Sequence, residues 1–499
     1  MRIRTLLLFV TCGAICAAAD VSGNWVAEQP RNDGTVQRTY FDLKQNGSQI
    51  TGEIRTIEQR YEITSSTGEG TSFTVTGTSR GGNTPRQATY TLTLQGDELQ
   101  VTGQPRRNRP PIQLVAHRTS PGGGAWPAYL EPPALHDVPY NGLAKIPPMG
   151  WNSWNKFAGT VDDAAVRGAA DAIASNGMKE AGYVYINIDD TWQGERDAQG
   201  VIHANRKFPD MKALADYVHS KGLKIGIYSS PGPATCADYP GSYGHEEQDA
   251  KTYAEWDMDY LKYDWCSAGN IYKDSAMHAV YQKMGDALRA SGRPIVFSLC
   301  QYGRADVWKW GPAVSANLWR TTGDIKDSWD SMTKIGFDQD PLAPYAAPGH
   351  WNDPDMLEVG NGGMTTEEYR THFSLWSMLA APLLAGNDLQ HMSPEILSIL
   401  TNKDVIAIDQ DPEGKQGTRL SKNGDSEIWT KDLSGGAKAV AFFNRAETPA
   451  TITLNWADLK MSSEPKRVDD LWAHKPVDLT GAGYTAQVPP HGVVMLRVQ

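Results

Sequence analysis

Apolar and polar residues alternate one by one in the first part of the chain, from residue 20 to about residue 118. Runs such as Phe73-Thr-Val-Thr and Tyr90-Thr-Leu-Thr-Leu are separated by Gly, Asn and Asp turns. This alternation predicts β-strands with one buried face, because successive strand side chains point to opposite sides. We expect residues 20–118 to form a small all-β accessory domain, an antiparallel barrel or sandwich, with a structural or binding role rather than a catalytic one.

The pattern changes at about residue 146, where short apolar runs begin to alternate with helical segments such as Asp162–Ala174 and Thr366–Met378. The predicted strands are Met149–Asn152, Val184–Asp189, Lys224–Ser229, Tyr260–Trp265, Ile295–Leu299, Leu318–Thr322, His350–Asp353 and Leu383–Asn387. Eight such strand–helix units predict a (β/α)8 TIM barrel over residues 146–407. The active site of such a barrel lies at the C-terminal ends of its strands.

Two further segments complete a multidomain architecture. Residues 119–145 are rich in Pro and Gly, which predicts a linker. From residue 408 to residue 499 the strand pattern returns, as in Ala439-Val-Ala-Phe-Phe-Asn and Val493-Val-Met-Leu-Arg-Val. We expect this last segment to form an antiparallel β-sandwich.

The first 19 residues combine a basic start, an apolar run and the small residues Ala17, Ala18 and Ala19. This order predicts a secretory signal peptide cleaved after Ala19, and therefore a secreted or periplasmic protein with no membrane insertion after cleavage. The oxidising compartment permits one disulfide among Cys236, Cys266 and Cys300.

Composition narrows the class of partner. The formal net charge is −11 and there is no long basic run, which argues against binding of nucleic acid. Sixteen Trp and twenty Tyr are enough to line a site for sugar rings. No metal-ligand spacing and no phosphate-binding Gly loop appears in the sequence, so we expect neither a metal nor a cofactor. The sequence leaves the oligomeric state open.

The candidate chemistry centres on the segment Tyr260-Leu-Lys-Tyr-Asp-Trp-Cys266. Lys262 and Asp264 share one face of this predicted strand, although unpaired charge is costly to bury. A structural ion pair is the simpler interpretation, but polar residues recur at the ends of the other strands: Trp154, Asp189, Asp190, Tyr228, Gln301, Arg320, Asp324 and Asp355. Together they predict a polyol site, in which the carboxylates Asp264 and Asp324 suit acid–base or nucleophilic work on a glycosidic bond.

Six ordered motifs then identify a family. They are Pro148-Met-Gly-Trp-Asn-Ser-Trp154, Ile188-Asp-Asp-Thr-Trp192, Gly226-Ile-Tyr228, Leu261-Lys-Tyr-Asp-Trp-Cys266, Trp319-Arg-Thr-Thr-Gly-Asp324 and Trp351-Asn-Asp-Pro-Asp-Met356. The chain resembles the α-galactosidases (melibiases) of glycoside hydrolase family 27. The resemblance runs from about Pro147 to the C-terminus and does not cover residues 20–118.

The resemblance implies an exo-acting, retaining double displacement that releases terminal α-linked D-galactose from oligo- or polysaccharides. Asp264 matches the nucleophile, and Asp324 matches the general acid/base. Lys262, on the same strand face, is expected to help keep Asp264 ionised. The resemblance also implies a disulfide between Cys236 and Cys266.

The sugar-binding residues follow from the same resemblance. Asp189 and Asp190 would hold O4 and the O6 arm, while Lys262 and Arg320 would bind the O2, O3 and O4 side. Trp154 would lie against the ring, and Tyr228 would position the nucleophile. Gln301 belongs to a segment that faces O2.

One departure from the family bears on that last residue. Many members have Cys-Glu-Trp where this chain has Cys300-Gln-Tyr302, so selectivity at O2 stays open, and Cys300 is expected to be a free, buried thiol.

Within the family, a β-L-arabinopyranosidase and an α-N-acetylgalactosaminidase are alternatives. The short side chain of Asp190 leaves room for the C6 arm and favours galactose. A catalytically inactive carbohydrate-binding protein is the alternative from another class, and the intact carboxylates argue against it.

Overall fold

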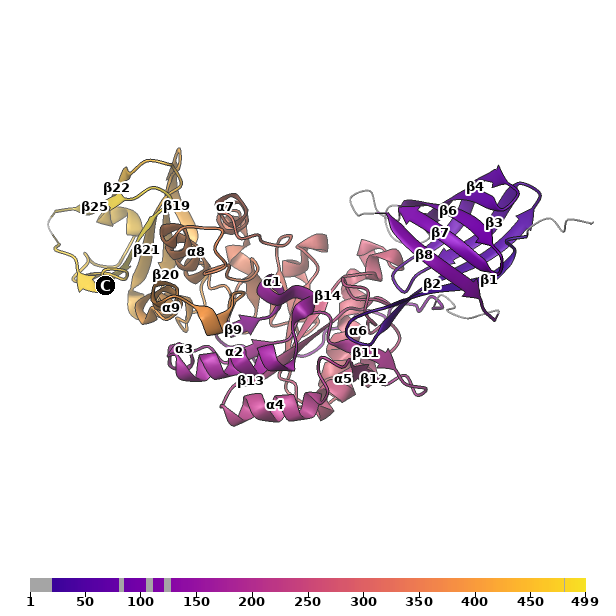
Figure 1. Ribbon diagram of the computed structural model, residues 1–499. Coiled ribbons are helices and arrows are strands. Elements are labelled where there is room, and N and C mark those ends of the chain that lie inside the picture. The colour runs from indigo at the N-terminus through magenta and orange to yellow at the C-terminus, as the bar shows by residue number, and fades with distance from the viewer. Residues whose placement is uncertain (1–19, 80–84, 105–110, 121–126, 480) are drawn as a thin grey trace, which may run out of the picture. The chain divides into compact units, whose positions relative to one another are not determined.

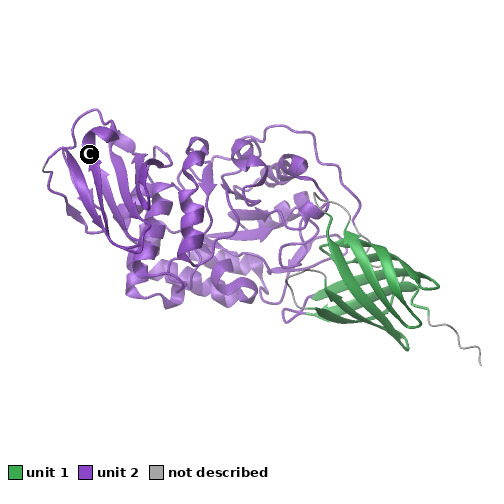
Figure 2. Ribbon diagram, turned by 90° about the horizontal axis from the view of Figure 1, so that it is seen from above, with its two compact units in different colours: residues 1–30, 36–80, 84–126 green, residues 31–35, 81–83, 127–499 purple. Residues whose placement is uncertain are grey.

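The computed structural model describes residues 20–79, 85–104, 111–120, 127–479 and 481–499. The predicted signal peptide lies outside these residues, as does part of the predicted linker. The chain forms two compact units, one of residues 1–30, 36–80 and 84–126 and the other of residues 31–35, 81–83 and 127–499 (Figure 2). Across the described residues, no helix has the length and apolar character that a membrane span requires.

The first unit is a closed antiparallel barrel (Figure 1). Its strands are β1 (Gly23–Pro30), β2 (Val36–Asn46), β3 (Gln49–Arg55), β4 (Arg60–Glu69), β5 (Ser72–Ser79), β6 (Gln87–Gln95), β7 (Glu98–Gln104) and β8 (Ile112–Arg118). β1 pairs with β8, so the sheet has no free edge. As the alternating pattern predicts, Trp25, Phe41 and Tyr90 are buried inside the barrel, while Thr74 and Thr91 point outward.

The second unit contains a parallel sheet with the strand order β17-β16-β15-β14-β13-β10-β9-β18. These strands are β9 (Met149–Asn152), β10 (Tyr185–Asn187), β13 (Lys224–Ser229), β14 (Tyr260–Asp264), β15 (Val296–Cys300), β16 (Leu318–Arg320), β17 (Trp351–Asp353) and β18 (Leu383–Ala385). A parallel bridge between Leu357, just after β17, and Ala385 of β18 joins the two ends of the sheet. The predicted TIM barrel is confirmed.

Helices connect these strands in the order that the sequence predicts. They are α1 (Trp154–Phe157), α2 (Asp163–Ser175), α3 (Met178–Ala181), α4 (Met211–Ser220), α5 (Glu246–Glu255), α6 (Met277–Ala290), α7 (Trp329–Phe337), α8 (Thr366–Met378), α9 (Pro394–Leu400) and α10 (Lys403–Asp409), and a short hairpin of β11 (Gln193–Arg196) and β12 (Ile202–Ala204) follows β10. Side chains cap the N-termini of several helices: Asp162 caps α2, and Thr365 with Glu368 forms a capping box on α8.

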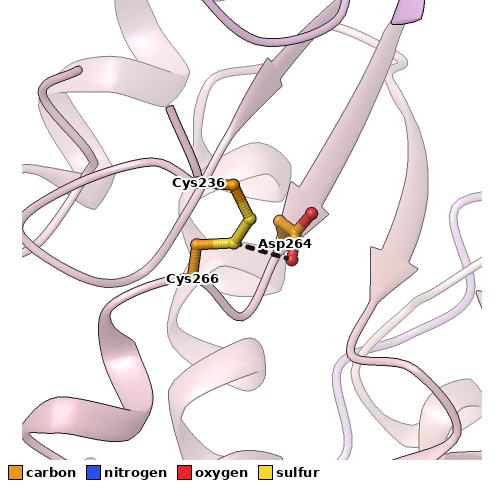
Figure 3. Close-up of side chains that lie close together, drawn as sticks. All are labelled: Cys236, Asp264 and Cys266. Atoms are coloured by element: carbon orange, nitrogen blue, oxygen red, sulfur yellow. Dashed lines mark hydrogen bonds between the residues drawn. A yellow bond between two sulfur atoms is a disulfide. The ribbon is translucent and has the colours of Figure 1, made fainter. Parts of the chain in front are cut away.

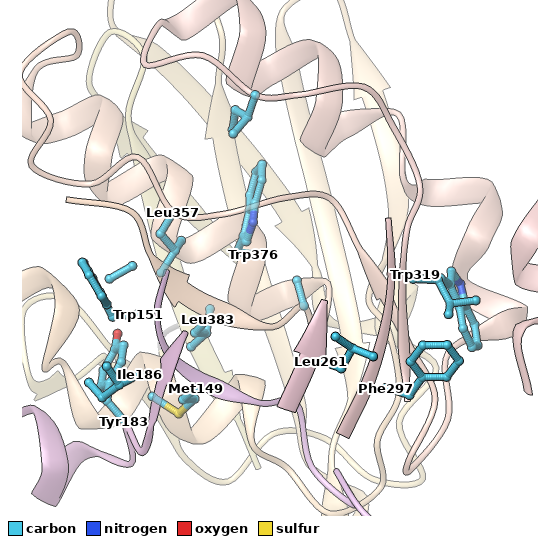
Figure 4. Packing of buried hydrophobic residues seen from close by; sticks show 14 of the residues in the cluster. Met149, Trp151, Tyr183, Ile186, Leu261, Phe297, Trp319, Leu357, Trp376 and Leu383 are labelled. Carbon is cyan, nitrogen blue, oxygen red and sulfur yellow. The ribbon is translucent and has the colours of Figure 1, made fainter. Parts of the chain in front are cut away.

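The core of the second unit is apolar on both sides of the sheet. Met149, Leu261, Phe297 and Leu383 come from the strands, and Trp376 comes from α8 (Figure 4). The strands read as continuous apolar runs because a parallel sheet has both of its faces covered. Polar side chains are therefore concentrated where the strands end.

The C-terminal segment is an antiparallel arrangement that confirms the predicted sandwich. A six-stranded sheet has the order β19-β20-β21-β26-β23-β24, and β22 pairs with β25. The strands are β19 (Thr418–Asn423), β20 (Ser426–Asp432), β21 (Lys438–Asn444), β22 (Ala450–Asn455), β23 (Val468–Asp470), β24 (Lys475–Pro476), β25 (Gly483–Val488) and β26 (Val493–Val498). Trp429 and Phe443 join the hydrophobic core of the barrel, whereas Val440 and Phe442 fill the core between the two sheets.

Candidate active site

A cavity of about 590 Å³ opens at the C-terminal ends of the parallel strands. Among the residues that line it are Trp154, Asp189, Asp190, Tyr228, Lys262, Asp264, Arg320 and Asp324. Eight of the nine predicted catalytic and sugar-binding residues thus line one cavity, although they span 171 positions of the sequence, from 154 to 324. Gln301 is the exception.

Asp264 is the last residue of β14, and both of its carboxylate oxygens accept hydrogen bonds. The Trp265 backbone N–H and the Tyr302 hydroxyl each donate to Oδ1 at 2.7 Å. The Tyr228 hydroxyl donates to Oδ2 at 3.2 Å, as expected for a residue that positions Asp264. Burial raises the pKa of Asp264, whereas the Lys262 charge and the bonds from Tyr302 and Trp265 act to lower it. The expected influence of Lys262 on Asp264 is therefore present, though it opposes a larger effect of burial.

Lys262 makes its direct contact with Asp189. Its Nζ lies 2.7 Å from Asp189 Oδ2, which also accepts a bond from Asn152 Nδ2 at 2.8 Å. Burial alone would lower the pKa of Lys262, but the charges of Asp189 and Asp264 hold that pKa well above its usual value. The lysine is a permanent cation on the floor of the cavity, with donors left for a ligand.

The loop after β13 holds the side chain of Asp190. Its Oδ2 accepts the Ala237 backbone N–H at 2.8 Å, and its Oδ1 accepts the Thr191 N–H at 2.7 Å. Burial raises the pKa of Asp190 to about 7. Backbone donors therefore hold both oxygens of the Asp190 carboxylate.

A disulfide fixes this loop against the end of β14. Cys236 and Cys266 are bonded, as predicted, and the Cys266 Sγ lies 3.4 Å from Asp264 Oδ1 (Figure 3). The two sulfurs and the Asp264 carboxylate lie within 4.8 Å of one another, which resembles a metal-ligand cluster. Since the sulfurs are bonded to each other, neither is a thiolate, and this cluster is not a metal site.

Arg320, at the end of β16, pairs with two carboxylates. Its Nη2 lies 3.1 Å from Asp324 Oδ1 and 2.9 Å from Asp355 Oδ2. The Asp324 side chain is 72% exposed and Asp355 is 3% exposed, so one carboxylate faces the cavity mouth and the other forms its wall. Asp324 is thus placed to exchange protons with a ligand and with solvent.

Asp355 is one of the strand-end residues expected in the polyol site, and it forms part of the cavity wall. It lines the cavity, its Oδ2 also accepts the Ile325 N–H at 2.8 Å, and its φ is +94°. A non-glycine residue in this region is strained and persists where its surroundings require it. The two acids of Asn352-Asp-Pro-Asp355, at the end of the seventh strand, are the sequence signal for this position.

Tyr302, and not the predicted Gln301, reaches the cavity. Gln301 is fully buried, and its Nε2 donates to the Arg320 carbonyl at 3.3 Å, away from the cavity. Tyr302 lines the cavity instead. The role of Gln301 as a sugar-contacting residue is not supported by the cavity lining. Cys300, just before them, is buried and free, as predicted.

Two other acids of the cavity were not selected from the sequence. Glu358 is buried, and its carboxylate accepts bonds from the side-chain amides of Asn155 and Asn361; burial raises its pKa to about 7. Asp327 lies just before Ser328, the residue that caps α7. The Asp327 carboxylate accepts bonds from the Tyr369 hydroxyl and the Gly363 N–H.

The whole barrel matches one protein family. A family model described as "Alpha galactosidase A" matches residues 146–411, and one described as "Alpha galactosidase C-terminal beta sandwich domain" matches residues 423–498. Alpha-galactosidase 2 of Arabidopsis thaliana is 50% identical over 361 residues, which cover 71% of this chain and 90% of that protein. The chain belongs to glycoside hydrolase family 27.

Solved structures of family 27 agree with this assignment. Alpha-galactosidase I from Mortierella vinacea is 38% identical with a TM-score of 0.69, and the match covers 72% of this chain and 98% of that one. The alpha-galactosidase from Saccharomyces cerevisiae, solved with raffinose, is 30% identical with a TM-score of 0.66, over 72% of this chain and 99% of that one. Neither family 27 model extends over the N-terminal barrel.

Proposed function

We propose that this protein is an exo-acting, retaining α-galactosidase that hydrolyses terminal α-linked D-galactose from oligo- or polysaccharides. The observation that carries the proposal is the cavity itself. A buried carboxylate, Asp264, and an exposed one, Asp324, share it with the charged groups of Asp189, Lys262 and Arg320. Related α-galactosidases with up to 51% identity support the choice of substrate class.

The chemistry divides between the two carboxylates. In the first step, an oxygen of Asp264 forms a bond to the anomeric carbon as the bond to the leaving oxygen breaks, and Asp324 gives its proton to that oxygen. In the second step, a water oxygen attacks the same carbon and loses a proton to Asp324. The electron pair of the ester bond returns to Asp264, and the product keeps the configuration of the substrate.

Recognition of the sugar follows from the fixed charges. Asp189 and Asp190 offer acceptors, whereas Lys262 and Arg320 offer donors, and Trp154 supplies an aromatic face. A hexose with one hydroxyl inverted leaves such buried groups unpaired, which is strongly unfavourable. The family member solved with raffinose supports oligosaccharides that end in galactose as substrates.

The experiment that tests the proposal is a proton NMR time course with an aryl α-D-galactopyranoside. We expect α-galactose to appear first and the β-anomer to follow by mutarotation. Appearance of β-galactose first means inversion, in which case Asp264 is a base rather than a nucleophile. Asp264→Asn is the matched control, because it keeps the size of the side chain and should show no turnover.

The same assay separates the alternatives. Faster cleavage of an aryl β-L-arabinopyranoside, or of an aryl α-N-acetylgalactosaminide, than of the galactoside reassigns the substrate. Binding of galactose without any cleavage supports the inactive binding protein.

A secreted or periplasmic location is part of the proposal. It is supported by the basic and apolar start of the sequence and by the Cys236–Cys266 disulfide, which an oxidising compartment favours. Fractionation of cells that express the full chain tests it, and recovery of the uncleaved protein in the cytosol contradicts it.

A further inference from the structure

The two oxygens of the Asp264 carboxylate have unequal surroundings. Oδ1 accepts two bonds at 2.7 Å, from the Trp265 N–H and the Tyr302 hydroxyl, and it also touches the Cys266 sulfur at 3.4 Å. Oδ2 accepts the longer 3.2 Å bond from the Tyr228 hydroxyl. A carboxylate oxygen has two lone-pair directions in its plane. Both are taken at Oδ1, so Oδ2 is the oxygen with a lone pair available for attack.

The backbone holds the Tyr302 phenol in this place. Tyr302 and Gly303 have φ values of +62° and +74°, and the Arg304 N–H closes a turn over them by donating to the Gln301 carbonyl at 3.1 Å. The Gly303 N–H and the Gln301 amide both donate to the Arg320 carbonyl. A tyrosine at positive φ is strained and is kept where other contacts determine it, as they do here.

The phenol also remains a donor. Burial and the neighbouring Asp264 charge raise the pKa of Tyr302 far above its usual value, so the hydroxyl keeps its proton. Its oxygen lies 3.5 Å from the Cys236 sulfur and 3.6 Å from the Cys266 sulfur, and the Arg320 guanidinium lies 5.9 Å from the ring centre. The ring thus stands between the disulfide and Arg320, with its hydroxyl directed at Oδ1.

We propose that Tyr302 is a positioning residue for the nucleophile, which assigns Oδ1 of Asp264 as the non-attacking oxygen and speeds the second half of the reaction. The inference rests on the proposed retaining mechanism and deepens it. In the covalent intermediate, Oδ2 is bonded to the anomeric carbon and Oδ1 is the carbonyl oxygen of the ester.

The two chemical steps then respond differently to this hydrogen bond. A bond to a charged carboxylate is stronger than a bond to a neutral ester carbonyl. When the ester bond breaks, its electron pair returns to Asp264, and the Tyr302 hydroxyl stabilises the charge that develops on the departing carboxylate. During the first step the same bond stabilises the free carboxylate, and so it slightly restrains the attack.

The variant Tyr302→Phe tests this division between the steps. With an aryl α-galactoside that has a good leaving group, we expect kcat to fall about 10- to 100-fold, as for loss of a bond to a charged group, and kcat/KM to change by less than about 3-fold, because it reports only the first step. A burst of released phenol should appear, and mass spectrometry should detect the galactosyl-enzyme. The acid limb of the kcat/KM profile should move to higher pH, since a donor that lowers the pKa of Asp264 is gone.

Tyr228→Phe is the matched comparison, because it removes a phenol from the other oxygen. It should lower kcat/KM and kcat together and give no burst. Equal losses in kcat and kcat/KM for Tyr302→Phe without a burst, or no loss at all, overturn the inference while the wild-type enzyme still retains configuration. Inversion by the wild-type enzyme overturns the proposed function and this inference together.

Discussion

The ammonium of Lys262 lies 2.7 Å from the carboxylate of Asp189 and links two strands that are not neighbours. β14 carries Lys262 and β10 leads into Asp189, with β13 between them in the sheet. The pairing offsets the desolvation cost of burying a lysine in the floor of the barrel, since each buried charge has a partner of opposite sign. It also places a cation close enough to Asp264 to oppose the effect of burial on that carboxyl group.

Replacing Lys262 tests both roles. In Lys262→Met, Asp189 loses a charged partner and the pKa of Asp264 rises further, so a smaller fraction of Asp264 is ionised at a given pH. Losing one member of a buried pair costs roughly 3–5 kcal/mol of folding stability, and kcat/KM should fall because less of Asp264 is ionised. The acid limb of the kcat/KM profile should move to higher pH. Lys224→Met, at the exposed start of β13, is the control and should keep the profile. An unmoved acid limb in Lys262→Met contradicts the electrostatic role.

Asp324 should behave as a proton donor whose importance depends on the leaving group. Asp324→Ala leaves Arg320 paired with Asp355, so the fold should persist. We expect turnover of galactosides with poor leaving groups to fall about 10²- to 10⁴-fold. For activated aryl galactosides the first step should remain faster than for those substrates. Azide, which needs no base, should restore turnover and yield α-galactosyl azide.

The neighbouring acid provides the comparison for that experiment. Asp327→Ala removes a carboxylate from the same cavity, and it should show neither azide rescue nor a dependence on the leaving group. If Asp324→Ala loses the same factor for every leaving group and forms no azide product, then Asp324 is not the acid/base.

The disulfide should contribute to stability and to sugar binding. It closes a separation of 30 residues, which corresponds to about 3–4 kcal/mol in the chain-entropy treatment. The double variant Cys236→Ser/Cys266→Ser should unfold at lower temperature. Its KM should rise more than its kcat falls, because the freed loop carries the Ala237 N–H that holds Asp190.

Reduction supplies an internal control for the disulfide. Dithiothreitol should shift the wild-type enzyme toward the behaviour of the double variant and should leave the double variant unchanged. An unaltered KM in the double variant means that Asp190 is held without the disulfide.

His372 should make the barrel sensitive to acid. It is fully buried in α8, its Nε2 accepts the Glu358 N–H at 3.1 Å, and burial lowers its pKa to about 3. A histidine with a depressed folded-state pKa contributes its full stability above about pH 6.5, and loses it as the pH falls toward 3, because the unfolded chain binds the proton first. In urea titrations, wild-type stability should fall about 2–3 kcal/mol more than that of His372→Gln between pH 7 and 4.5.

The exposed His391 is the matched control, with 78% of its side chain accessible. His391→Gln should follow the wild-type pH dependence. If His372→Gln has the same pH slope as the wild type, protonation of His372 does not drive the acid sensitivity.

Much of the site could be read from the sequence because strand geometry is local. The two-residue period of a strand puts Lys262 and Asp264 on one face, and eight strand–helix units place the ends of their strands at one rim. The order of the motifs also predicts that Asp189, Arg320 and Asp324 lie at that rim. For the N-terminal domain the sequence predicts either a barrel or a sandwich. The choice depends on the pairing of β1 with β8, which joins segments that are about 90 residues apart.

What only the tertiary structure decided depends on loops and on distant partners. The alternation of faces ends where β15 ends, and the positive φ of Tyr302 turns its phenol, rather than the Gln301 amide, toward Asp264. The partner of Lys262 lies 73 residues away and depends on the order of strands in the sheet. The sequence by itself determined which residues end the strands, because a strand has a fixed local period. The fold determined which oxygen of Asp264 each donor meets, because turn geometry and long-range packing are properties of the whole chain.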